Sequence, residues 1–218
     1  YNNGKGQVDN MTRESRQHVF LDVVEYSQHP DYPTGCESIA LYMLLKYHGA
    51  EVTPDQIVDL LPKGPQPFQD EAGQWHGANL ERQFVGDPRS AESFGVFNRP
   101  IAQVAEHFLP GVQTTEGASL DDILAILDSG NPVVAWYVIE PQRKITYRCH
   151  WLDERGETIR WPSGEHAVVV CGCDDDNIFY RDPNTGGTRA VSFKIFDEGF
   201  RQLGGRIVYY LKSSQAAD

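Results

Sequence analysis

The sequence predicts an α+β fold in which N-terminal helices pack on a mostly antiparallel C-terminal sheet. Up to Gly130, apolar residues recur mainly at helical spacing. After Gly130, short β-branched and aromatic runs alternate with turn residues, as in strands joined by hairpins. Helices followed by strands favour an α+β layout over alternating β and α units.

Composition limits the kinds of partner. The chain has 218 residues, 40% of them hydrophobic and 23% charged, which is a globular composition. We expect a polar N-terminal arm over residues 1–17 and a single domain over 18–218. The net charge of −12 argues against nucleic-acid binding, because polyanions repel an acidic surface.

No apolar run approaches the roughly 20 residues that cross a bilayer, so we expect no membrane segment in this chain. Its first residue is Tyr1, which suggests that an upstream piece has been removed and favours an extracellular or cell-surface location. Four cysteines are too few for a disulfide scaffold of this size.

The expected elements follow in order. The stretch "HVFLDVVEYSQ" (18–28) predicts a strand, and "HPDYPTG" predicts a turn. Helices are predicted from Cys36 to a stop at Gly49, over "TPDQIVDLLP", "PIAQVAEHFL" and "SLDDILAILDSG". Between the second and third of these helices, residues 63–99 predict a long polar segment, which is uncommon unless it binds something. Strands are predicted over 131–139, 166–173, 177–182 and 206–211.

Cys36 stands in the first turn of its predicted helix. A helix N-terminus carries partial positive charge and unpaired N–H groups, which lower the pKa of a thiol and can hold an oxyanion. Cys36 is therefore a candidate nucleophile.

A thiol nucleophile needs a base and a group that orients the base. His166 opens one predicted strand and Asp182 closes the next, so antiparallel pairing would make the two neighbours. Gln28, eight residues before Cys36, could donate to an oxyanion beside the Cys36 N–H. Of the other six histidines only His150, beside Cys149, rivals His166.

The order of a strand ending in Gln, then "TGCES", "GNPVVAW", "EHAVVV" and "DPNTG", resembles the papain-like cysteine peptidases of the C39-like group, relatives of the bacteriocin-leader processing peptidases. The resemblance covers residues 18–211, and "FVGDP" looks like a further family feature. It implies a papain-like fold, Cys36 as nucleophile, His166 as general base and acid, Asp182 as orienting group and Gln28 as oxyanion donor. The implied partner is a peptide or protein substrate, with no cofactor and no metal.

Three alternatives stay open. The first is an inactive binding module that keeps the peptidase fold, and the second is an amidase or transglutaminase with the same thiol chemistry. The third is a zinc site built from Cys149, His150, Cys171 and Cys173, in which Cys171 and Cys173 would point to the same face of a strand. Because the spacing is not a C-x-x-C pair, buried core thiols, or a disulfide from Cys149 to Cys171 or Cys173, each explain these cysteines better than zinc does.

Overall fold

The computed structural model describes residues 18–141 and 143–212. The expected arm over 1–17 lies outside these ranges. The architecture is mixed α+β, with helices in the N-terminal part and an antiparallel sheet in the C-terminal part, as predicted. Within the described residues, no helix has the length and apolar character needed to span a membrane.

Four of the five helices in the described residues correspond to predicted ones, and their starts follow from local chemistry. Thr53 and Ser119 each form a capping box. The cap hydroxyl accepts a hydrogen bond from the backbone N–H three residues later, and the side chain of that later residue accepts one from the backbone N–H of the cap residue. Pro54 occupies the first helical position, where no N–H is needed. The helices are α1 (Cys36–Tyr47), α2 (Pro54–Leu60), α3 (Asn98–Glu106), α4 (Leu120–Asp128) and α5 (Phe193–Gln202).

The main sheet has seven strands and is antiparallel throughout. Its path runs β12-β11-β10-β7-β13-β6, and β1 pairs with β10 off this path. The strands are β1 (Val19–Phe20), β6 (Gln113–Thr115), β7 (Val133–Val138), β10 (Glu165–Cys173), β11 (Asn177–Asp182), β12 (Gly187–Ser192) and β13 (Ile207–Tyr209).

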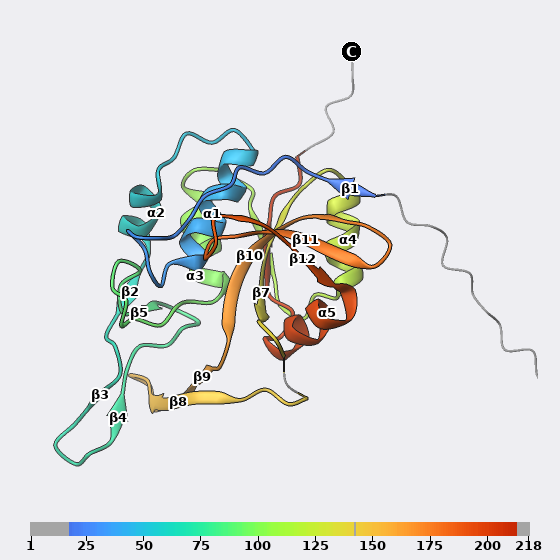
Figure 1. Ribbon diagram of the computed structural model, residues 1–218. Coiled ribbons are helices and arrows are strands. Elements are labelled where there is room, and N and C mark those ends of the chain that lie inside the picture. The colour runs from blue at the N-terminus through green and yellow to red at the C-terminus, as the bar shows by residue number, and fades with distance from the viewer. Residues whose placement is uncertain (1–17, 142, 213–218) are drawn as a thin grey trace, which may run out of the picture.

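Two hydrophobic cores lie on the two faces of this sheet, beneath the helices that Figure 1 shows on either side of it. Helices α1, α2 and α3 cover one face, where Ala167 and Val169 of β10 join their core. Helices α4 and α5 cover the other face, which receives Val168 and Val170. β10 is therefore buried between helices on both sides, which explains its nearly continuous apolar sequence.

A β-bulge in β10 corrects one expectation about the cysteines. The register shifts between Val170 and Gly172, so the regular alternation of side chains breaks at this point. Cys171 lies in the core under α1, whereas Cys173 lies in the core under α4 and α5. The prediction that Cys171 and Cys173 share one face is wrong.

The segment from residue 63 to 99 contains short strands that the sequence did not indicate. A two-stranded sheet and a four-stranded sheet of order β3-β4-β8-β9 lie beside the main sheet, and the β3–β4 hairpin projects from the molecule (Figure 1). Their strands are β2 (Lys63–Gly64), β3 (Phe68–Gln69), β4 (Trp75–His76), β5 (Phe84–Val85), β8 (Tyr147–Leu152) and β9 (Thr158–Pro162).

The predicted strand over 18–28 is wrong for most of its length. Only Val19 and Phe20 pair with β10, and the chain from Leu21 to Gln28 runs in irregular conformation. Tertiary contacts hold this segment instead. Leu21 donates its N–H to the Cys171 carbonyl at 2.7 Å, and Arg181 donates from Nε to the Val23 carbonyl at 2.7 Å.

Candidate active site

The turn before α1 fixes where Cys36 lies. Gly35 is the residue before the helix, and a Cβ there would lie 2.9 Å from Cβ of Tyr32 and 3.1 Å from Cβ of Pro88. The close approach of these chains therefore requires a glycine. Thr34 donates its hydroxyl to the Ser90 carbonyl at 2.9 Å. The stretch "FVGDP" (84–88) and the residues directly after it thus support the start of α1.

Cys36 is buried, with 7% of its surface exposed. Burial raises the pKa of its thiol well above the ordinary value, and the charges of Glu37 and Glu165 raise it further. A backbone hydrogen bond from Ala167 works in the opposite direction and is outweighed. The prediction that the helix start lowers this pKa is therefore wrong, because desolvation and two carboxylates dominate.

His166 and Asp182 lie together as the antiparallel arrangement predicts. Nε2 of His166 is 2.8 Å from Oδ1 of Asp182, and both side chains are buried. Asn184 also donates its backbone N–H to the same oxygen, at 2.9 Å. Although burial acts to raise it, the pKa of Asp182 is held below its ordinary value by the hydrogen bond and charge of His166. This pairing leaves Nδ1 of His166 available to another group.

Gln28 reaches the same region from the irregular segment. Its backbone N–H donates to the Pro183 carbonyl at 2.8 Å, next to Asp182, and the ring of His29 contacts Asn184 at 2.9 Å. The Gln28 side chain is buried, and its Nε2 donates to the Pro33 carbonyl at 2.8 Å. One of the two amide N–H groups is thereby used, and the second remains for a ligand.

The four predicted residues are linked through chain neighbours. Cys36 contacts Ala167, which follows His166, and Gln28 contacts Pro183, which follows Asp182. In the described ranges, no hydrogen bond joins the Cys36 thiol directly to His166. The sulfur atom instead lies within 4.8 Å of carboxylate oxygens of Glu37 and Glu165, and those oxygens lie within 4.8 Å of each other.

Sequence reasoning missed Glu37 and Glu165. Both stand in the stretches "TGCES" and "GEHAV", directly beside the predicted nucleophile and base. An acidic residue next to a helix start or a strand start is ordinarily solvated, so nothing local marks these two as buried.

The alternative zinc site is not assembled. Among the described residues, the one cluster of three or more potential ligands is Cys36, Glu37 and Glu165. All four cysteines are present as thiols, so Cys149 forms no disulfide with Cys171 or Cys173. His150 lies on β8, opposite Arg160 of β9, and is exposed.

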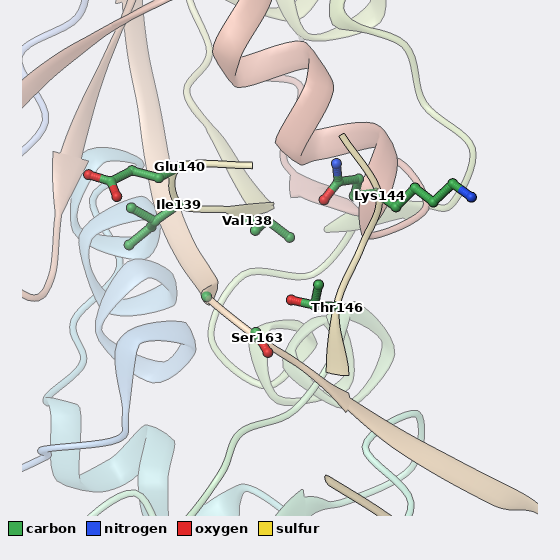
Figure 2. A pocket seen from close by; sticks show the side chains of 8 residues that line it. Val138, Ile139, Glu140, Lys144, Thr146 and Ser163 are labelled. Carbon is green, nitrogen blue, oxygen red and sulfur yellow. The ribbon is translucent and has the colours of Figure 1, made fainter. Parts of the chain in front are cut away.

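A pocket of about 200 Å³ lies at the end of β7. Val138 lines it and is the register partner of Glu165, so the pocket adjoins the end of β10 that carries His166. Figure 2 shows Val138, Thr146 and Ser163 gathered around the pocket, while the Lys144 side chain extends away from them. The walls offer both apolar and hydroxyl groups.

The fold is that of the C39-like peptidases. It is similar to a solved structure of a C39-like peptidase from Bacillus anthracis, with a TM-score of 0.78 and 25% sequence identity. The match covers 92% of this chain and 100% of that chain.

The profile of the Peptidase_C39 like family matches residues 20–208, and the chain belongs to this family. It is also 30% identical over 196 residues to the uncharacterized protein YvpB of Bacillus subtilis (strain 168). That match covers 88% of this chain and 76% of YvpB.

Proposed function

We propose that residues 18–218 form one cysteine peptidase domain that hydrolyses peptide bonds. The observation that carries the proposal is the buried His166–Asp182 pair, with Nε2 bound at 2.8 Å and Nδ1 left over, next to the strand residue that contacts Cys36. Family membership supports a peptide substrate. The pocket beside β7 could receive one of its side chains.

In this proposal the Cys36 thiol gives its proton to Nδ1 of His166 and the sulfur attacks the substrate carbonyl carbon. Asp182 holds the imidazolium that forms. The developing oxyanion accepts hydrogen bonds from the Cys36 backbone N–H at the helix start and from the second amide N–H of Gln28. His166 then returns the proton to the leaving amine, and water hydrolyses the thioester by the same groups. The reaction requires the sulfur to turn from the glutamates towards Nδ1.

The test is digestion of a proteome-derived peptide library by the wild-type protein and by Cys36→Ala. We expect cleavage by the wild type alone, with both proteins showing the same circular dichroism. Cleavage by Cys36→Ala at the wild-type level would exclude Cys36 as nucleophile.

A binding module is the second candidate, because the thiol has a raised pKa and lies against two glutamates. Peptide capture without cleavage by the wild-type protein would favour it. Release of acyl-amine products in place of acids, with an added primary amine, would favour the transglutaminase alternative.

A further inference from the structure

Two glutamates lie beside Cys36 without a basic partner. Glu37 follows Cys36 on α1 and is 0% exposed, and Glu165, the first residue of β10, is half-buried. Carboxylate oxygens of both lie within 4.8 Å of each other and of the Cys36 sulfur. In the part of the chain that the structure describes, neither glutamate takes part in an ion pair.

The hydrogen bonds of the two carboxyl groups are incomplete. Oε1 of Glu37 accepts the Val96 N–H at 2.8 Å, but Oε2 of Glu37 and Oε1 of Glu165 are buried without a hydrogen-bond partner. Two carboxylates whose oxygens lie within 4.8 Å of each other in a desolvated site cannot both be charged at low cost. A proton held by one of them would neutralise one charge and supply the missing donor.

We propose that Glu37 and Glu165 share a proton beside Cys36 and act as positioning residues that set the pH range in which the thiol ionises. The consequence for turnover rests on the proposed function, whereas the ionisation itself does not. Burial raises the pKa of Glu37 to about 7 against the Val96 hydrogen bond, and burial and Glu37 raise that of Glu165 well above its usual range. The pair loses its first proton near neutral pH and holds the second to higher pH, so it adds negative charge beside the sulfur as the pH rises, and this charge opposes thiolate formation.

The groups around the pair leave this effect uncompensated. The segment before α3 contributes the Val96 N–H and Gly95. A Cβ added at Gly95 would lie 2.3 Å from Oε1 of Glu37, so this chain passes directly against the carboxyl group. β9 contributes the Trp161 ring near the same Cβ position, and β7 contributes Val138 opposite Glu165.

Three groups that can be cationic lie on β10, β11 and β12, and one of them, Arg181 on β11, pairs with Glu25 at 2.7 Å. The other two are His166 on β10 and Arg189 on β12, which lie 2.8 Å and 4.0 Å from the two carboxylate oxygens of Asp182. Both of these groups are therefore engaged by Asp182. The sulfur of Cys36 accepts a hydrogen bond from the Ala167 N–H.

The sharing is tested by infrared spectroscopy of the unmodified protein at pH 8, where exposed carboxyl groups are ionised. We expect the carbonyl stretch of a protonated carboxyl group in the wild type and its loss in Glu165→Gln, because a lone Glu37 gives up its proton more readily than a pair does. Absence of this band from the wild type would overturn the proposal without any variant.

The effect on the thiol is tested by the rate at which iodoacetamide alkylates Cys36, followed by mass spectrometry of its peptide across pH. In the double variant Glu37→Gln/Glu165→Gln we expect the thiol to titrate at least about one pH unit lower, and alkylation at pH 8 to be about tenfold faster. Glu51→Gln, an exposed glutamate elsewhere, is the matched control and should titrate as the wild type does.

Two further results would overturn the proposal. One is a double variant whose thiol titrates as in the wild type. The other is an equimolar metal ion in the purified protein whose chelation alone accelerates alkylation, because a cation would then neutralise the pair. Alkylation needs no substrate, so a protein without peptidase activity that still shows both expected shifts would contradict the proposed function and leave this proposal intact.

Discussion

At Asp182, a single oxygen atom accepts two hydrogen bonds. Oδ1 receives His166 Nε2 at 2.8 Å and the Asn184 N–H at 2.9 Å. An asparagine can place its carbonyl oxygen in the same position, so Asp182→Asn keeps both hydrogen bonds and loses only the charge. An alanine keeps neither, and the His166 ring loses its anchor.

We therefore expect kcat/KM of Asp182→Asn to stay within roughly 10- to 100-fold of wild type, and that of Asp182→Ala to fall clearly further. The measurement is turnover of one fluorogenic peptide by both variants, with circular dichroism as the folding control. Equal damage by the two substitutions would mean that the carboxylate charge, and not the geometry at Oδ1, is what His166 needs.

Gln28 gives a second prediction at the scale of one residue. Its Nε2 already donates to Pro33, so Gln28→Ala should loosen the turn slightly but act mainly on the tetrahedral state. We expect kcat to fall by roughly 10²-fold or more with a smaller change in KM. Steady-state kinetics decide the matter, and a change confined to KM would make Gln28 a substrate contact.

The start of α1 is the element on which the site depends most directly. In Gly35→Ala the new methyl group would lie 2.9 Å from Cβ of Tyr32, closer than such atoms approach, so the helix start must shift. A shift of this kind misplaces both Cys36 and its N–H, and we expect kcat/KM to fall by about tenfold or more.

The control is Gly187→Ala, since a Cβ at Gly187 meets no atom within 4 Å. Both variants are assayed for turnover and for the thermal midpoint of unfolding. Loss of turnover in Gly187→Ala equal to that in Gly35→Ala would show that the effect does not come from the α1 start.

Elements with local signals could be predicted from the sequence. The capping residues Thr53 and Ser119 marked two helices, and β11 has the bounds expected from its alternation and flanking turns. α5 was missed because Gly199 interrupts its pattern. This glycine is needed for packing, as a Cβ there would lie 2.4 Å from the Val138 carbonyl oxygen.

Elements defined by distant partners could not be predicted. β4 pairs with β8 through His76 and Leu152, and no local pattern announces a two-residue strand. For the same reason, only part of the candidate site could be predicted from the sequence. The contact between His166 and Asp182 follows from adjacent strands joined by a tight turn, whereas the burial of Glu37 and Glu165 depends on how α1 packs against β10.

For the whole molecule, the glutamate pair should make stability decline as pH rises. A carboxyl group whose pKa is raised on folding stabilises fully below its unfolded value, and this contribution is lost as pH rises through the folded value. For Glu37 the window runs from its ordinary 4.5 to about 7, and Glu165 extends it upward. His48 has the opposite effect on stability between about pH 4 and 6.5, because burial lowers its pKa from 6.5 to about 4 and stability then rises with pH in that range.

The clearest window therefore opens at about pH 6.5, above which His48 no longer offsets the pair and we expect the free energy of unfolding of the wild type to fall as the pH rises. Urea denaturation at several pH values measures it. Glu37→Gln/Glu165→Gln should lose most of this dependence, while Glu51→Gln should keep it. A wild-type stability that rises through this window would contradict the prediction.

The position of β10 has a consequence for motion. This strand has partners on both edges and a helix-covered core on each face, so its amide protons can reach solvent only when both cores separate. Hydrogen exchange in its interior should therefore proceed with the free energy of global unfolding, whereas the projecting β3–β4 hairpin exchanges by small local openings. His166 is fixed to the slowest-exchanging part of the molecule. Any motion that admits a substrate must then come from the segments around β10 and not from the strand itself.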